Sequence, residues 1–320
     1  MLNYILMQRN QIFSNSFLNL DDKAISQEIK KNGFFSFEKA LTDDFVENVY
    51  NDVKSSGLSL NTNNIAGVYF THGNQFFLTH MLGVSEKFFD YCTSEKVLNV
   101  CSDFLGKEYR LKALRYYENF GGQNMQWHTD NKYYDQNKKG STVTKTPGLI
   151  FIAYISDVND GEFQYIKGSH LWSAENKNHD YTQEEIETKF SKDIVGFKKP
   201  KGSILIYNTF GIHRAKPTKD KNFVRKSLFF QVDREINHSE PILVKTEFIK
   251  KFDDRIKLYL GFGKRSGQRV YPETSLETMP FNKITSSKIF GWMAGRFANK
   301  LPGFIRKRVR NAIKKVNSSV

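Results

Sequence analysis

The stretch Gln126-Trp127-His128-Thr129-Asp130 is the part of the sequence around which a fold and a site can be predicted. Alternate side chains of an extended chain share a face, so His128 and Asp130 can reach one small cation together. An imidazole and a carboxylate are two of the three groups of the 2-His-1-carboxylate facial triad, which binds Fe(II) and leaves coordination positions open. Since the chain has 7 histidines, a chance His-x-Asp pair is common. The pair therefore needs a third ligand.

His213 and Arg225 supply what the pair lacks. His213 follows a predicted strand, Ser203 to Tyr207, and Arg225 lies twelve residues later on the next predicted strand. A histidine at a strand end and an arginine on the adjacent antiparallel strand can face the same barrel interior. His213 can then complete the triad. Arg225 offers a planar, permanently charged fork for the far carboxylate of a 2-oxo acid whose other end binds the metal.

Around these residues the sequence predicts many short strands with glycine-marked turns. The apolar run from Gly148 to Ile155 is typical of a strand buried on both faces. Further strands are predicted at Gly33 to Phe37, Tyr109 to Tyr117, Glu162 to Ile166, Ser203 to Tyr207 and Ser227 to Val232. Helices are predicted at Ser26 to Asn32, after an N-cap at Thr42, and as a pair between Ser85 and Leu105. The pattern favours a mainly β fold with flanking helices, an antiparallel double-sheet barrel or jelly roll.

The 320 residues are enough for one large barrel domain with appended helices, or for two ordinary domains. We expect an N-terminal extension over residues 1–24, the barrel domain over residues 25–240 and a C-terminal extension over residues 241–320. Within the barrel, residues 173–201 are long, polar and partly helical. An insertion of that length indicates a lid or a mobile surface loop.

The net charge of +14 comes mostly from the end of the chain. Residues 281–320 contain ten basic and no acidic residues, which leaves +4 for the first 280. Within residues 288–316, apolar positions at helical spacing are flanked by basic ones, as in helices that lie on anionic membranes. The alternative is a helix that packs on the barrel and keeps a solvated basic face. Whichever alternative holds, the charge lies in the tail. The rest of the chain is nearly neutral, which disfavours a nucleic-acid partner.

The cysteine content favours a cytoplasmic protein. There are 2 cysteines, and Cys101 lies at helical spacing among apolar residues, so a disulfide framework is not expected. The first seven residues lack the basic start of a signal peptide. No apolar run reaches the roughly 18 residues that a membrane span requires.

Together these motifs resemble the phytanoyl-CoA dioxygenase family of Fe(II)/2-oxoglutarate oxygenases. The matching segments are Lys31–Phe35, Gln126–Asp130, Asp160–His170, and His213 with Val224-Arg225-Lys226. The likeness runs from about Ile25 to Asp233. One departure is Lys167, because the family usually has proline before Gly-Ser-His.

The resemblance implies a double-stranded β-helix, the cupin-like jelly roll, that binds Fe(II) through His128, Asp130 and His213. It implies that Arg225 binds 2-oxoglutarate, and the candidates for further contacts to this co-substrate are Ser227, Tyr116 and Ile152. Such enzymes use O2 to convert 2-oxoglutarate into succinate and CO2 while they oxidise a substrate. We therefore expect a hydroxylase that acts on a small or lipid-like molecule. Asp130 disfavours halogenation, because related halogenases lack this carboxylate.

Some assignments stay open. Arg115 is either a substrate contact or an ordinary strand residue, and Phe229-Phe230 is interpreted as core packing. His170 is interpreted as a turn histidine at the edge of the site rather than a ligand. The alternatives to a small-molecule hydroxylase are a nucleic-acid or protein-modifying oxygenase, and a non-catalytic binding module of the same fold.

Overall fold

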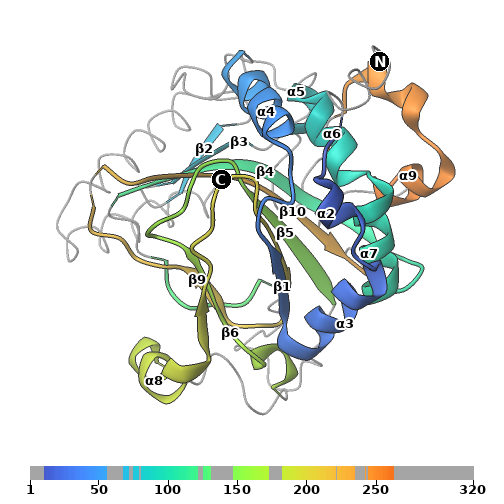
Figure 1. The fold of residues 1–320 in the computed structure, drawn as a ribbon. Coiled ribbons are helices and arrows are strands. Elements are labelled where there is room, and N and C mark those ends of the chain that lie inside the picture. The colour runs from blue at the N-terminus through green and yellow to red at the C-terminus, as the bar shows by residue number, and fades with distance from the viewer. Residues whose placement is uncertain are drawn as a thin grey trace, which may run out of the picture.

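The computed structural model describes residues 11–55, 68–71, 75–78, 81–121, 125–130, 147–172, 182–220, 222–234, 242 and 244–262. Two antiparallel sheets make up the described fold, and most helices cover one face of the larger sheet (Figure 1). The larger sheet has the strand order β1-β8-β5-β10-β4-β3-β2, and the smaller has the order β7-β6-β9. This arrangement confirms the predicted mainly β fold with flanking helices.

The strands of the larger sheet are β1 (Phe34–Phe37), β2 (Val68–Thr71), β3 (Gln75–Leu78), β4 (Arg110–Phe120), β5 (Gly148–Tyr154), β8 (Ile204–Asn208) and β10 (Val224–Asp233). Those of the smaller sheet are β6 (Phe163–Ile166), β7 (Ile194–Gly196) and β9 (His213–Ala215). The α-helices are α2 (Asn15–Leu18), α3 (Asp22–Asn32), α4 (Asp43–Ser55), α5 (Met81–Val84), α6 (Glu86–Cys92), α7 (Glu95–Leu105), α8 (Gln183–Lys189) and α9 (Asp254–Tyr259). Short 3-10 helices occupy Ser169–Leu171, Ser191–Asp193 and Thr246–Lys251.

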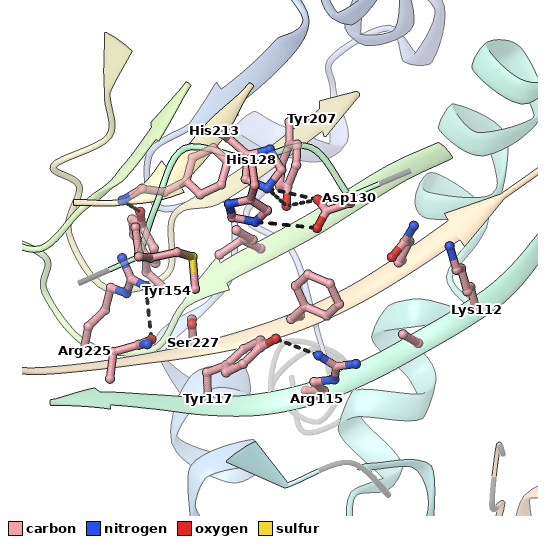
Figure 2. A pocket seen from close by; sticks show the side chains of 18 residues that line it. Lys112, Arg115, Tyr117, His128, Asp130, Tyr154, Tyr207, His213, Arg225 and Ser227 are labelled. Carbon is pink, nitrogen blue, oxygen red and sulfur yellow. Dashed lines mark hydrogen bonds and ion pairs between the residues drawn. The ribbon is translucent and has the colours of Figure 1, made fainter. Parts of the chain in front are cut away.

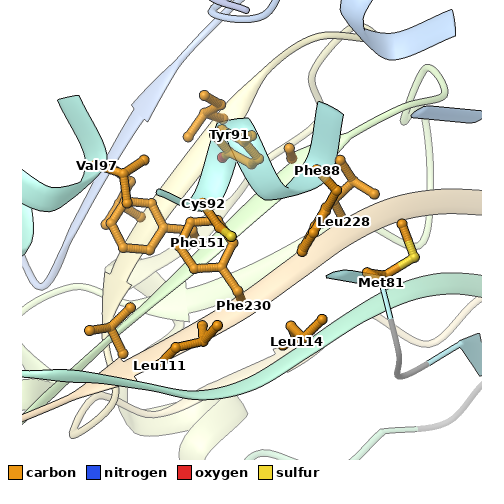
Figure 3. Close-up of a cluster of buried hydrophobic side chains, with 14 of the residues drawn as sticks. Met81, Phe88, Tyr91, Cys92, Val97, Leu111, Leu114, Phe151, Leu228 and Phe230 are labelled. Atoms are coloured by element: carbon orange, nitrogen blue, oxygen red, sulfur yellow. The ribbon is translucent and has the colours of Figure 1, made fainter. Parts of the chain in front are cut away.

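The core lies between the larger sheet and the helices (Figure 3). Phe151 of β5 and Phe230 of β10 stack with ring centroids 4.5 Å apart, and Tyr91 of α6 packs on Phe230 at 5.3 Å. Each such side chain contributes about 1.5–3 kcal/mol when it is fully buried. Cys92 lies in the same cluster, and both cysteines are buried free thiols. Burial raises the pKa of both thiols.

Helix α4 begins as predicted. Thr42 precedes α4, and its hydroxyl accepts a hydrogen bond from the Phe45 backbone N–H at 3.2 Å. Asp43 and Asp44 lie in the first turn, where acidic side chains interact favourably with the helix dipole. The same hydroxyl donates to the carbonyl oxygen of Gln11 at 2.6 Å, so the cap also ties the start of the described chain to the domain.

Both predicted domain boundaries have buried core residues on either side of them. Residue 25 lies within α3, which begins at Asp22, and the earlier Phe13 and Phe17 are buried in the main core. At the other end, Phe248 and Tyr259 are buried in the same core, so the packed domain continues past residue 240. The basic stretch 288–316 lies outside the described residues. Among those described, no helix has the length and apolar character to cross a membrane.

The predicted insertion 173–201 is partly a structural element of the barrel. Its last part contains β7, which pairs with β6, and the following Phe197 is 2% exposed. Because this part belongs to a sheet, the lid interpretation is wrong for it. The strand could not be predicted, because three residues are too few to give a visible alternation of polar and apolar side chains. The helix α8 precedes it, and it contacts the site, as described below.

Candidate active site

Three side chains from two distant parts of the chain meet beside the smaller sheet. The segment at His128 pairs with His213 of β9 through backbone hydrogen bonds of 3.0 and 2.9 Å in the two directions. The carboxylate of Asp130 lies 3.0 Å from His213 Nε2 and 3.9 Å from His128 Nε2. The potential ligand atoms of the three residues all lie within 4.8 Å of one another. The structure therefore brings the predicted triad together.

Both imidazoles present Nε2 to the same point. His128 Nδ1 lies 2.8 Å from the carbonyl oxygen of Gln126, and His213 Nδ1 lies 3.0 Å from that of Gly211. A ring that donates through Nδ1–H keeps Nε2 unprotonated, which is the form that binds a metal. Two such imidazoles and one carboxylate fit Fe(II), and they leave positions open for other ligands.

Tyr207 of β8 supports the carboxylate. Its hydroxyl donates to Asp130 Oδ2 at 3.1 Å and lies 3.4 Å from His213 Nε2. Burial raises the pKa of the Asp130 carboxyl, but His213, His128 and the Tyr207 hydroxyl outweigh burial and hold that pKa well below its ordinary value. Burial and the nearby carboxylate raise the pKa of Tyr207. At neutral pH, Asp130 is therefore an anion and Tyr207 a neutral donor.

The triad opens onto a cavity of about 310 Å³ that strands of both sheets line (Figure 2). Ligand pockets range from roughly 300 to 1,000 Å³, so this volume suits small molecules. The described lining residues are Lys112, Ala113, Arg115, Tyr117, Asn119, Met125, His128, Asp130, Ile152, Tyr154, Phe163, Tyr207, His213, Ala215, Arg225, Ser227, Phe229 and Gln231.

Arg225 lies at one end of this cavity and is 7% exposed. Its Nη1 donates to the carbonyl oxygen of Gly161, and its Nη2 donates to Asn119 Oδ1 at 3.0 Å. Arg225 Nε and Asn119 Nδ2 are buried N–H groups without a hydrogen-bond partner in the described part of the chain. Ser227, on the same face of β10, also lines the cavity. Buried donors of this kind fit a carboxylate, such as the far end of 2-oxoglutarate.

Of the two weaker candidates for co-substrate contacts, one lies in the cavity and one does not. Ile152 lines the cavity. Tyr116 is fully buried in the core on the helix side, where its hydroxyl donates to Glu118. The prediction for Tyr116 is wrong because successive strand residues face opposite sides. Its neighbour Tyr117 lines the cavity instead.

Ten of the described lining residues were not identified from the sequence: Lys112, Ala113, Tyr117, Asn119, Met125, Tyr154, Phe163, Tyr207, Ala215 and Gln231. Alternation along β4 from Arg115 would have identified Tyr117 and Asn119, because all three share a face. No sequence signal marks Tyr207, whose role depends on contacts with residues far away in the chain. Phe229, interpreted as core, lines the cavity, whereas Phe230 is in the core.

Arg115 lies in the cavity, whereas His170 lies outside the triad. Arg115 lines the cavity, and its Nη1 donates to the Tyr117 hydroxyl at 3.0 Å. His170 is not part of the triad. It lies in the 3-10 helix after β6, with Nε2 2.9 Å from the carbonyl oxygen of Lys30. Burial lowers the pKa of His170, which suits a neutral structural histidine.

Helix α8 fixes the backbone next to His128. Gln183 Oε1 accepts from the Trp127 backbone N–H at 2.7 Å, and Gln183 Nε2 donates to the Trp127 carbonyl oxygen at 3.3 Å. The Arg214 guanidinium lies 4.2 Å from the centroid of the Trp127 ring. Helix α8, in the segment predicted to be a lid, thus holds the residue that precedes His128 of the candidate triad.

Solved structures of similar fold are known. HygX from Streptomyces hygroscopicus with nickel and 2-oxoglutarate bound matches with a TM-score of 0.52 and 13% identity, over 66% of this chain and 86% of that chain. The non-heme alpha ketoglutarate dependent carbocyclase SnoK from nogalamycin biosynthesis matches with a TM-score of 0.51 and 11% identity, over 74% and 92%. The epimerase SnoN from the same biosynthesis matches with a TM-score of 0.52 and 11% identity, over 79% and 95%. At such identities the likeness shows the fold, which is the predicted jelly roll.

Sequence comparisons are more specific. Comparison with curated proteins gives no match. The family model described as phytanoyl-CoA dioxygenase (PhyH) matches residues 29–226, a span that contains the whole triad and Arg225. Because the match covers more than half of the chain, this protein belongs to the phytanoyl-CoA dioxygenase family.

Proposed function

We propose that this protein is a non-haem Fe(II)/2-oxoglutarate-dependent dioxygenase that hydroxylates a C–H bond of a small organic molecule. The observation that carries the proposal is the convergence of His128, Asp130 and His213 in the cavity that also holds the buried Arg225. Bound Fe(II) would activate O2 at the expense of 2-oxoglutarate, which is converted to succinate and CO2.

The side chains of the cavity have different roles in this reaction. The triad would hold the metal, and Tyr207 keeps the Asp130 carboxylate oriented. Arg225 binds the far carboxylate of 2-oxoglutarate, and Ser227 adds a hydroxyl beside it. Apolar side chains such as Ile152 and Phe229 limit the access of water to the cavity between the triad and Arg225. These roles match the donors that the cavity presents.

The first test of the proposal is spectroscopic. Anaerobic Fe(II) and 2-oxoglutarate together should give a charge-transfer band in the visible, because the 2-oxo acid would bind to the Fe(II) that the triad holds. The Asp130→Ala variant lacks one ligand and should lose iron-dependent succinate formation. A folded, iron-loaded wild type without the band would contradict the assignment. A binding module of the same fold would bind the ligands but form no succinate.

The second test concerns the type of reaction. The structural neighbours include a carbocyclase and an epimerase, so the fold is compatible with several outcomes. Mass spectrometry of a metabolite extract distinguishes them, because hydroxylation adds one oxygen, ring closure removes two hydrogens and epimerisation leaves the mass unchanged. We expect a 2-oxoglutarate-dependent gain of one oxygen. A product of unchanged mass or one that is lighter by two hydrogens would replace the hydroxylase proposal.

We also infer a cytoplasmic setting, which the two buried free thiols support. A nucleic-acid substrate is disfavoured by the nearly neutral first 280 residues, whose net charge is +4. The lack of an effect of added DNA or RNA on succinate formation would agree with this inference.

A further inference from the structure

A second group of charged side chains lies in the cavity, at the end away from Arg225 (Figure 2). Lys112 and Arg115 line this end, whereas Arg225 bonds to Asn119 nearer the other end of the same strand, β4. Arg115 and Asn119 are four positions apart in β4. This separation corresponds to roughly 13 Å along an extended chain. The triad lies between the two ends (Figure 2).

Lys112 faces the cavity because the pairing of β4 with β10 is irregular at this point. The register shifts between Gln231 and Val232, and Lys112 is left out of the ladder. A β-bulge re-aims a side chain, and bulges are frequent next to active sites. As a result, Lys112 and Ala113 both line the cavity, although neighbours in a regular strand face opposite sides.

Described neighbours hold both cationic groups in place. Lys112 Nζ lies 2.8 Å from the carboxylate of Asp233, whose side chain is 1% exposed. Gln231 Nε2 donates to the other oxygen of that carboxylate at 2.9 Å. The Arg115 guanidinium donates to the Tyr117 hydroxyl at 3.0 Å and lies 5.6 Å from the centroid of the Phe229 ring. The two positive groups are thus oriented before any ligand binds.

The charges of the cavity wall show what these groups can bind. Among the eighteen described lining residues, Asp130 is the one carboxylate, and it is a ligand of the proposed metal site. Arg225 serves the co-substrate. Lys112 and Arg115 therefore face the space that remains for the substrate. Even with Asp233 paired to Lys112, the two cationic groups make this end of the described wall positive, which favours an anionic group there.

We propose that Lys112 and Arg115 bind an anionic group of the substrate, a carboxylate or a phosphate, and so position the substrate beside the metal. This inference rests on the proposed oxygenase function and narrows its substrate class. A planar guanidinium binds either anion through two parallel hydrogen bonds, and the ammonium adds a point charge.

The charge of the substrate can be tested before its identity is known. A metabolite extract is separated by anion exchange at mildly alkaline pH into a retained and an unretained fraction. Each fraction is then incubated with Fe(II)-loaded protein and 2-oxoglutarate. We expect the 2-oxoglutarate-dependent product to arise from the retained fraction, and its mass identifies the carboxylate or phosphate. A substrate found in the unretained fraction overturns the inference while the oxygenase function stands. No conversion in either fraction, together with no charge-transfer band, overturns the proposed function itself.

Variants of the two cationic residues then locate the contact. Arg115→Gln and Lys112→Gln should each raise the KM of the converted anion by about 30-fold, the ratio for 2 kcal/mol, the lower end of the loss for a buried charge pair. Arg115→Lys keeps the charge and should raise it less. Lys167→Gln removes one charge from an exposed turn and serves as the matched control. The charge-transfer titration with 2-oxoglutarate shows that each variant retains a folded site. KM values within about twofold of wild type in both glutamine variants would overturn the assignment.

Discussion

The Tyr207 hydroxyl bonds to a carboxylate of the candidate metal site without being part of the triad. It donates to Asp130 Oδ2 at 3.1 Å, and loss of such an outer hydrogen bond typically weakens metal binding by about 10- to 100-fold. We predict this loss for Tyr207→Phe, measured by titration with Fe(II) without oxygen. Tyr165→Phe is the matched control, because the Tyr165 hydroxyl is also buried but donates to the carbonyl oxygen of Asn208. Equal losses in both variants would mean that general packing, not this hydrogen bond, governs the affinity.

Arg225 should govern the affinity for 2-oxoglutarate rather than the affinity for iron. Arg225→Ala removes the charged fork from a buried position, which costs on the order of 2 to 5 kcal/mol in the binding of a carboxylate. Arg225→Lys keeps the charge without the fork, so its loss should be intermediate. The KM for 2-oxoglutarate measures the effect, and Fe(II) titration provides the comparison. Loss of both affinities to the same degree would indicate a misfolded site.

The residues that could be predicted from the sequence are those whose chemistry restricts their spacing. His128, Asp130 and His213 must converge on one ion, and Arg225 must face the same interior, so their types and order are informative. Tyr207 could not be found in this way. Its contact with Asp130 depends on how β8 packs against a segment 77 residues away, and tyrosine is common in strands of many proteins.

Helix α8 should behave as a support for the metal site. Gln183 makes two hydrogen bonds with the Trp127 backbone, one residue before His128. We predict that Gln183→Ala weakens Fe(II) binding several-fold while it lowers the melting temperature only slightly, because α8 packs in a small cluster apart from the main core. Glu184→Ala changes an exposed residue of the same helix and should leave both quantities unchanged. Unchanged iron affinity in Gln183→Ala would show that the helix has no such role.

The bounds and faces of strands were predictable where the pattern of apolar residues was unambiguous, and less so where buried polar residues blurred it. In β4 the helix side carries the buried Tyr116 and Glu118, so polarity does not distinguish it from the cavity side. The face of β4 was consequently misassigned by one residue. β5, with apolar residues on both faces, was predicted almost to its ends because a run of this kind has few alternative structures.

At the scale of the whole molecule, the described domain and the basic end of the chain have different electrostatic properties. The first 280 residues carry a net charge of +4, whereas residues 281–320 carry ten basic and no acidic residues. Helix and strand packing extends at least from Phe13 to Leu260 within the described residues. A truncation after Thr278 therefore keeps every residue that the structure describes, and it removes most of the charge.

We propose that residues 288–316 bind the surface of an anionic membrane. Burial of apolar residues and attraction of the basic ones should act together, and each lysine or arginine near the surface contributes about 1 kcal/mol. Full-length protein should sediment with liposomes that contain anionic lipid, less so as salt rises, and the truncation after Thr278 should stay in the supernatant. Salt has this effect because it screens exposed charges beyond roughly 10 Å at 0.1 M. If the truncated protein instead becomes insoluble without lipid, the apolar side of this segment packs on the barrel, and the membrane proposal fails.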